Sequence, residues 1–276
     1  MSVYGNKPKP PVKWAGGKTQ LLRAFDPLFP RGGYDLYIEP FVGGGAVFFY
    51  LLPPRSVLID SNPELINFYQ VVRDDLEPLL ADLGKHENTA EYYYHLRSLD
   101  PGGMDRISRA SRFLYLNKTA YNGLWRVNSR GRHNVPYGRY KNPRIVDAEN
   151  LRLVSLALRQ AEIVAGDFSR ALDFARPGAF VYLDPPYHPL SATANFTSYT
   201  AGAFHDEDQR RLAGVFRRLD ALGCQVMLSN SDTPFIRELY AGYDIRVVQA
   251  RRAISCRVRG RGPVTEVVIR NYKQDL

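Results

Sequence analysis

Three features of the sequence predict an α/β protein with an open, mostly parallel sheet and a helical insertion. Short apolar segments that end in glycine or an acid alternate with helical patterns near both ends of the chain. Between them, residues 65–117 follow a helical period. The last two apolar segments alternate in polarity. Strands that alternate with helices pair in parallel, because each helix returns the chain to the same edge, whereas consecutive alternating segments suit an antiparallel pair.

Composition narrows the class of protein. The 276 residues are 45% hydrophobic, enough to bury a core in one large domain or in two small ones. A formal charge of +9 indicates a polyanionic partner without identifying it. Two cysteines, Cys224 and Cys256, are too few for a disulfide framework or a cysteine-rich zinc site, so a reducing cytoplasmic setting fits best. No run of about eighteen apolar residues occurs, and we expect no membrane contact.

The first α/β units lie between residues 34 and 64. Residues 34–39 are short, apolar and aromatic, and predict a strand that runs into a glycine turn and a helix over 46–52. Residues 56–60 predict a second strand, which ends on an acid. The Ser-Asn-Pro-Glu that follows combines a cap, an N-terminal proline and an early acid, and together these start a helix.

The middle of the chain has a different character. Residues 65–117 carry apolar side chains at helical spacing, interrupted at 100–103 by Asp-Pro-Gly-Gly, and predict an inserted group of helices. Residues 118–144 then contain seven Lys or Arg and no acid, among many Gly, Asn, Pro and aromatic residues. A loop or hairpin that presents positive charge is the expected structure.

The α/β pattern resumes after residue 147. Helices are predicted over 148–159, 170–175, 206–222 and 233–240, and strands over 161–165, 179–183 and 225–229. Residues 245–248 and 264–272 alternate in polarity and predict a closing antiparallel pair.

The glycine turn at residues 39–45 and the acid that ends the second strand predict a nucleoside site. Glycines after a first strand let the backbone approach a ligand, and an acid ending the second strand can accept both ribose hydroxyls. Gly43 and Asp60 are separated by close to the roughly twenty positions that such folds need, and Glu39 opens the turn. Close packing of the glycines against their sheet is the alternative, and the paired acid favours the nucleoside. The glycine spacing does not match the dinucleotide pattern G-x-G-x-x-G.

Residues 14–19, Trp-Ala-Gly-Gly-Lys-Thr, are only superficially similar to a phosphate-binding loop. Val12 stands where that pattern requires glycine, and no strand precedes the turn. Trp14 and Lys18 flank it. Either this is a structural turn with a packed indole, or it covers the amino-acid end of a bound cofactor, with Lys18 suited to a carboxylate. Spacing alone does not separate the two.

Asp184-Pro185-Pro186-Tyr187 is the most informative tetrapeptide. An apolar strand delivers Asp184 to its carboxyl end, where open α/β sheets build their sites, and two prolines hold the following backbone rigid. The acid can accept one N–H of an amine, the Pro185 carbonyl can accept the other, and Tyr187 offers a face for stacking. These residues predict a pocket for a planar exocyclic amine. A proline-stiffened surface turn, the alternative, does not need this combination.

The basic block at residues 118–144 predicts an interface with nucleic acid. Arginines contact phosphates or read guanine edges, Asn122 can read adenine, and aromatic side chains stack on bases or wedge between them. The complete absence of acids distinguishes this block from an ordinary solvated surface. After Lys118, which opens the block, the basic residues Arg126, Arg130, Arg132, Arg139, Lys141 and Arg144 are interleaved with Tyr121, Trp125, Tyr137 and Tyr140. A second basic run is expected to add phosphate contacts or to form a solvated hairpin, and consists of Arg251, Arg252, Arg257, Arg259 and Arg261.

Six blocks of sequence, taken in order, closely resemble the Dam-type DNA adenine N6-methyltransferases, the D12 class of alpha-group amino methyltransferases. The blocks are residues 13–18, 38–45, 60–63, 115–126, 134–140 and 184–190, and residues 191–197 add to the likeness. The resemblance covers nearly the whole chain. It implies a Rossmann-like methyltransferase sheet, S-adenosylmethionine as methyl donor, and a helical target-recognition domain inserted into the sheet.

The resemblance also implies roles for individual residues. Cofactor contacts fall on Trp14, Lys18, Asp60 and Asp184, and the same pocket is lined by Phe41, Gly43, Asp167 and Phe168. Target recognition falls on Tyr121, Asn122, Leu124, Arg126, Pro136 and Arg139, with Lys13 reaching an outer base. In this family such a block usually reads GATC. Trp125 occupies a variable position and residues 253–256 match the family's C-terminal hairpin loosely, which leaves the recognition sequence open.

The implied domains are a catalytic one, residues 1–64 and 146–276, and a target-recognition one over residues 65–145. We expect a monomer that flips the target adenine out of double-stranded DNA, because its N6 cannot meet a buried cofactor while stacked. Tyr187 would stack on the base while Asp184 and the Pro185 carbonyl aim its amino group at the methyl donor for direct transfer.

Other functions remain as alternatives. The five histidines, His86, His95, His133, His188 and His205, lack ligand spacing, so no metal site and no metal nuclease is expected. Relatives that methylate RNA or a protein amide typically carry Asn at position 184 and lack the basic block. A DNA-binding protein with an inactive methyltransferase fold is the third possibility, and the intact Asp184–Tyr187 and Asp60 argue against it. The sequence leaves open whether the enzyme accompanies a restriction enzyme or acts alone.

Overall fold

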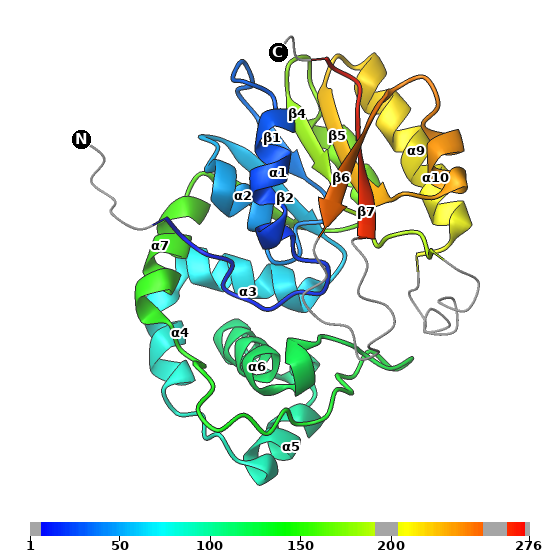
Figure 1. Ribbon diagram of the computed structural model, residues 1–276. Helices are drawn as coiled ribbons and strands as arrows, with labels where there is room; N and C mark the ends of the chain where they lie inside the picture. The colour runs from blue at the N-terminus through cyan, green and yellow to red at the C-terminus, as the bar shows by residue number, and fades with distance from the viewer. Residues whose placement is uncertain (1–6, 191–203, 251–263, 274–276) are drawn as a thin grey trace. The chain divides into compact units, whose positions relative to one another are not determined.

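The sheet of this protein has seven strands, in the order β3-β2-β1-β4-β5-β7-β6 (Figure 1). The structure is a computed structural model that describes residues 7–190, 204–250 and 264–273. Strands β2, β1, β4 and β5 are paired in parallel, whereas β7 runs antiparallel to both β5 and β6. The predicted Rossmann-like sheet with a closing antiparallel pair is therefore confirmed.

The strands lie close to where the apolar patterns predicted them. Their bounds are β1 Tyr37–Glu39, β2 Ser56–Asp60, β3 Ala161–Ala165, β4 Phe180–Leu183, β5 Gln225–Ser231, β6 Asp244–Ala250 and β7 Val264–Arg270. Every residue of β1 and β4 is buried. Strands covered on both faces read as continuous apolar runs, which explains why these segments lack alternation.

The helices confirm the alternation with strands and the inserted helical segment. Their bounds are α1 Leu22–Phe25, α2 Ala46–Leu51, α3 Pro63–Asp74, α4 Leu76–Leu83, α5 Ala90–Ser98, α6 Arg106–Thr119, α7 Ala148–Leu158, α8 Ala171–Phe174, α9 Asp206–Ala221 and α10 Pro234–Leu239. Single 3₁₀ turns are η1 Lys18–Gln20, η2 Asp26–Leu28, η3 Pro101–Gly103, η4 Tyr121–Gly123 and η5 Phe168–Arg170. As predicted, α3 begins after a cap: the Asn62 side chain accepts from the backbone N–H groups of Glu64 and Leu65.

Contacts divide the chain into two compact units. The first takes in residues 1–17, 42–52 and 60–166, and the second residues 18–41, 53–59 and 167–276, as far as these are described. The domain limits expected from the sequence, at 64/65 and 145/146, remain a prediction. No helix in the described part of the chain combines the length and the apolar character that crossing a bilayer requires.

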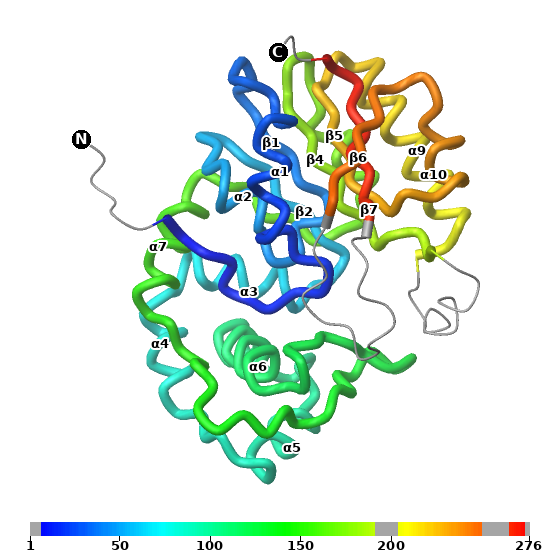
Figure 2. The backbone as a smooth tube through the Cα atoms, in the orientation of Figure 1, coloured from blue at the N-terminus to red at the C-terminus, as the bar shows by residue number. Residues whose placement is uncertain are grey.

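The first unit is organised around α6. This helix is buried along most of its length and packs against α3, α4 and α5 (Figure 1). Residues 7–17 are tied to the same unit, running from α7 toward α6 (Figure 2). Lys9 and Asn150 of α7 exchange two hydrogen bonds of 2.8 and 2.9 Å, and Lys13 and Asn117 of α6 exchange two of 2.8 and 2.7 Å. These four hydrogen bonds hold the N-terminal segment against α7 and α6.

The second unit contains the carboxyl ends of β1, β4 and β5. Helix α9 is amphipathic and packs against β5, with α10 beside it (Figure 1). Its first turn holds three acids, which favour a helix N-terminus. The polar residues at the end of β5 are buried beneath this helix, Asn230 being completely inaccessible to solvent. Buried polar groups of this kind require partners, and these partners lie at the candidate site.

Candidate active site

The glycine turn after β1 is shaped by Trp14. Gly43 has a φ of 46°, in the left-handed region, and a Cβ there would lie 2.6 Å from Cδ1 of the Trp14 indole. The indole also contacts Phe113, with ring centroids 6.5 Å apart. Glycine is therefore required at position 43 for two independent reasons. The packed indole that the sequence left as one alternative is present.

Asp60 ends β2 and holds the same turn. Its Oδ2 accepts the Gly43 N–H at 3.0 Å and its Oδ1 accepts the Asn62 N–H at 2.9 Å. Burial raises the pKa of Asp60, although both N–H groups favour the charged carboxylate. Because each carboxylate oxygen has two lone pairs, the acid can support the turn and still accept a hydroxyl pair.

Asp184 lies immediately after β4 and is bound on one oxygen by two groups. The Lys18 ammonium lies 2.8 Å from its Oδ1, and the Ser229 hydroxyl donates to the same oxygen at 2.8 Å. The side chain of Lys18 is only 6% exposed and that of Asp184 18%. Ser229 is in turn hydrogen-bonded to Tyr182 of β4 at 2.9 Å. Of the prolines that follow, Pro185 is buried and Pro186 exposed.

Tyr187 is held at its hydroxyl and on one ring face. The hydroxyl donates to Oε2 of Glu266 at 2.7 Å, and the Lys18 ammonium lies 4.6 Å from the ring centroid. Burial, reinforced by the charge of Asp184, raises the pKa of Tyr187 well above its usual value. The phenol is therefore neutral in the physiological range and acts as a donor.

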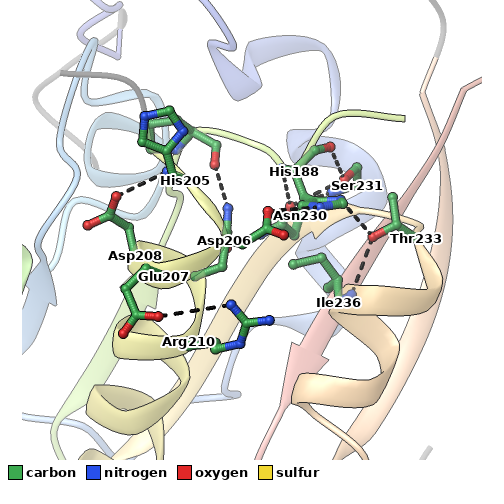
Figure 3. A network of polar contacts seen from close by, with 12 residues as sticks. His188, His205, Asp206, Glu207, Asp208, Arg210, Asn230, Ser231, Thr233 and Ile236 are labelled. Carbon is green, nitrogen blue, oxygen red and sulfur yellow. Dashed lines mark hydrogen bonds and ion pairs between the residues drawn. The ribbon is translucent and has the colours of Figure 1, made fainter. Parts of the chain in front are cut away.

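A buried network holds the backbone after Asp184. Gln209 of α9 donates to the Pro186 carbonyl at 2.9 Å, and Asn230 of β5 donates to the Gln209 side chain at 3.1 Å. Figure 3 shows how Asn230 and Ser231 surround the backbone of His188. The His188 N–H donates to Asn230 at 3.0 Å, and the Ser231 hydroxyl donates to the His188 carbonyl at 2.5 Å. All of these donors and acceptors are uncharged amides, carbonyls or hydroxyls, so the network fixes the geometry of the backbone and adds no charge to the site.

The His188 ring is engaged structurally. Its Nδ1 lies 3.1 Å from the Thr233 hydroxyl, and its Nε2 lies 3.4 Å from Asp206 (Figure 3). Within the described residues, no group of three or more His, Cys, Asp or Glu is arranged to hold a metal ion.

Phe41 and Phe168 form an aromatic group with Arg211. Their rings stack with centroids 5.3 Å apart, and the Arg211 guanidinium lies 4.1 Å from the Phe168 centroid. Arg211 also forms two hydrogen bonds to Asp167, of 2.8 and 2.9 Å, and these lower the pKa of that acid to about 2. Glu39 is buried at the end of β1, where its charge adds to burial in raising the pKa of Tyr37.

The basic block forms a short hairpin after α6. Isolated bridges join Ala120 to Tyr137 and Val127 to His133. Trp125 packs beneath it, with ring centroids 4.4 Å from Phe113 and 4.6 Å from His133. The residues expected to meet the target are all exposed, namely Tyr121, Asn122, Leu124, Arg126, Arg130, Arg132, Pro136 and Arg139. The second basic run, Arg251 to Arg261, and residues 191–197 lie outside the described residues.

Cations gather at the base of this hairpin. Lys13 is exposed, and its ammonium lies 4.4 Å from the Tyr140 ring centroid. A Cβ at Gly123 would lie 2.2 Å from Cδ of Lys13, so glycine admits the lysine side chain. Burial lowers the pKa of Lys118 to about 8, and repulsion from Lys13 and Arg144 adds to this. Because these cations repel one another, an anion that binds between them would be stabilised.

The structure gathers the predicted site residues into separate groups. Trp14, Gly43 and Asp60 meet in the first unit, and Lys18, Asp184 and Tyr187 meet in the second. Sequence reasoning missed five residues that contact the predicted ones, namely Gln209, Arg211, Ser229, Asn230 and Glu266. A polar Ser-Asn-Ser at the carboxyl end of an apolar strand was the available signal for two of them.

Known proteins similar to this chain match it along nearly its whole length. The family model of D12 class N6 adenine-specific DNA methyltransferases matches residues 14–254. The chain is 46% identical over 272 residues to the type II methyltransferase M1.LlaDCHI of Lactococcus lactis subsp. cremoris, covering 96% of this chain and 95% of that protein. It is 43% identical over 286 residues to the type II methyltransferase M.MjaIII of Methanocaldococcus jannaschii, covering 96% and 99%. It is 40% identical over 261 residues to the DNA adenine methylase of Escherichia coli K12, covering 93% of each.

The buried network predicts a stability effect at Asn230. The Asn230→Ala substitution should lower the free energy of unfolding by about 2–3 kcal/mol, because the His188 N–H loses its acceptor and the side-chain oxygen of Gln209 loses its donor. Urea denaturation measures the change. Asn142→Ala, at an exposed loop position, is the control and should stay within about 0.5 kcal/mol. Equal denaturation midpoints for the two variants would show that the network does not hold the segment.

Proposed function

The chain belongs to the D12 class N6 adenine-specific DNA methyltransferases, and we propose that it transfers the methyl group of S-adenosylmethionine to adenine N6 within GATC. The observation that carries the mechanism is that one oxygen of the Asp184 carboxylate is held by two other side chains. This carboxylate follows a buried strand, and both Lys18 and Ser229 bind its Oδ1. With Oδ1 held, the carboxylate can accept an amino N–H in a defined direction. The Pro185 carbonyl accepts the second N–H.

The residues present fit S-adenosylmethionine. When bound, it supplies a methyl group made electrophilic by a positively charged sulfur. The buried, oppositely charged Lys18 and Asp184 are complementary to the carboxylate and ammonium of an amino acid. Asp60, already ordered by the Gly43 N–H, suits a ribose hydroxyl pair. We assign the cofactor roles to Trp14, Lys18, Glu39, Phe41, Gly43, Asp60, Asp167, Phe168 and Asp184.

The reaction requires the target adenine to leave the duplex. A stacked base cannot bring its amino group to a buried carboxylate, so base flipping is part of the proposal. Tyr187, a neutral phenol with one ring face under Lys18, offers its other face to the extruded base. Orientation of the amino nitrogen toward the donor methyl then lowers the barrier, without a covalent intermediate on the enzyme.

Recognition of the duplex is assigned to the hairpin after α6 and to Lys13. Its exposed arginines match guanine edges and phosphates, and the left-handed φ of 53° at Asn122 presents that amide at a sharp turn. The residues assigned to DNA are Lys13, Tyr121, Asn122, Leu124, Arg126, Arg130, Arg132, Pro136 and Arg139. We further propose that the target-recognition domain spans residues 65–145 and that the enzyme acts in the cytoplasm as a monomer.

Substitution of Asp184 tests the mechanism. Asp184→Ala should reduce methyl transfer by about a hundredfold or more while duplex affinity stays largely unchanged, because the proposed phosphate contacts lie on the hairpin. Transfer of a labelled methyl group and a DNA-binding titration measure the two quantities. Asp173→Ala, at an exposed carboxylate paired with Arg170, is the control. Turnover near that of the control would remove Asp184 from the mechanism.

Arg126 tests the assignment of base recognition. Its Nε donates to Asn134 at 2.8 Å, which orients an exposed guanidinium. Arg126→Ala should weaken recognition of GATC by about 1–3 kcal/mol and relax discrimination at one base-pair position. Arg130→Ala, at the tip of the hairpin, should weaken binding to all sequences alike and reduce the slope of affinity against salt concentration by about one unit. Methylation of oligonucleotides differing by single base pairs from GATC measures both. A uniform loss in Arg126→Ala would make it a phosphate contact.

Lys118 predicts that DNA affinity depends on pH. Because its pKa is about 8, the Lys118 amine of the free protein becomes mostly neutral above that pH. A nearby phosphate favours the charged ammonium. Binding then takes up a proton, so affinity should fall by up to about tenfold between about pH 7 and about pH 9. Titrations at a fixed salt concentration measure this. Lys118→Arg stays charged throughout and should remove the dependence. An unchanged pH slope in that variant would exclude Lys118 as the source.

A further inference from the structure

Glu266 is a carboxylate in an apolar strand. It lies on β7, opposite Ser231 of β5 and Val248 of β6, and the residues after it, from Val267 to Ile269, are completely buried. Glu266 itself is half-buried, and a charged side chain loses part of its hydration in such a position. Burial accordingly raises the pKa of Glu266. The position therefore calls for a specific interaction that repays this cost.

A second cost comes from Asp184. The negative charge of Asp184 repels that of Glu266, and Lys18 is the cation that acts on both. An apolar side chain on β7 would avoid both the burial of a charge and this repulsion. What the carboxylate supplies instead is the 2.7 Å hydrogen bond that it accepts from the Tyr187 hydroxyl. A charged acceptor makes that bond stronger than a neutral one.

The bond constrains the ring of Tyr187. The ring is attached to the backbone at one end, bonded to Glu266 at the other, and contacted on one face by Lys18. We propose that Glu266 is a positioning residue for methyl transfer, fixing the Tyr187 ring so that its other face receives the target adenine. The inference rests on the proposed stacking role of Tyr187. It adds a strand far from the Asp-Pro-Pro-Tyr segment in sequence to the machinery of the reaction.

A double-mutant cycle tests this role. Glu266→Leu removes the acceptor and Tyr187→Phe removes the donor while keeping the ring. Each should lower the single-turnover rate constant by about tenfold or more, with cofactor and DNA saturating. The double variant should be no slower than the slower single variant, because both changes break one bond. Glu266→Gln keeps an acceptor and should recover most of the rate.

The controls separate positioning from a general structural effect. Glu207→Gln changes a carboxylate that is 87% exposed on α9 and should leave the rate unchanged. The loss in Glu266→Leu should fall on the rate constant, with the KM for the cofactor unaltered. A Glu266→Leu loss of equal size with and without Tyr187→Phe would overturn the proposal, and so would a Glu266→Gln variant as slow as Glu266→Leu.

One further variant separates the stacking role of Tyr187 from the positioning role of Glu266. Tyr187→Ala removes the ring and should lower the rate more than Tyr187→Phe does. A normal rate in Tyr187→Ala would overturn the stacking role, and the role of Glu266 with it. A large loss in Tyr187→Ala together with additive effects of Glu266→Leu and Tyr187→Phe would overturn the positioning role alone.

Discussion

The ion pair between Lys18 and Asp184 is the interaction around which the second unit is arranged. Both side chains are largely withdrawn from water, so removing either one leaves a buried charge without its partner. Lys18 opens a single 3₁₀ turn near the N-terminus, whereas Asp184 follows β4. The two can meet only in the folded chain. Ser229 reaches the same oxygen because β5 pairs with β4 in parallel, which places the two carboxyl ends side by side.

Two different kinds of bond hold the segment from Asp184 to His188. Charged groups fix its side chains, with Lys18 on Asp184 and Glu266 on Tyr187. Neutral amides and hydroxyls from α9 and β5 fix its backbone. The two prolines contribute rigidity but remove two backbone donors, so side chains must supply the bonds that a regular strand or helix would otherwise make. A site that works by orienting an amine depends on this, because displacement of the acceptor by a fraction of an ångström misdirects the lone pair.

The sequence predicted the strands, the helical insertion and the delivery of Asp184 to a sheet edge, because these depend on local periodicity and on the turn chemistry of glycine and proline. It did not predict Glu266 or Ser229 as partners of Tyr187 and Asp184. Those pairs depend on strand order, and β7 lies between β5 and β6 although it comes last in the chain. Gln209 was hidden for a related reason. Its position on an amphipathic helix predicts burial, but its bond to Pro186 depends on how the helix packs.

The glycine turn shows why structural and functional explanations of one motif need not exclude each other. Gly43 is required by its left-handed φ and by the Trp14 indole, and neither reason involves a ligand. Its N–H is nevertheless held by Asp60, the acid to which we assign the ribose. The carboxylate that orders the turn is thus the one that a nucleoside would use, and burial that raises its pKa also strengthens its hydrogen bonds in a low dielectric. Because Asp60 holds the turn by a bond within the protein, the order of the turn does not depend on a ligand, and binding has less entropy to remove.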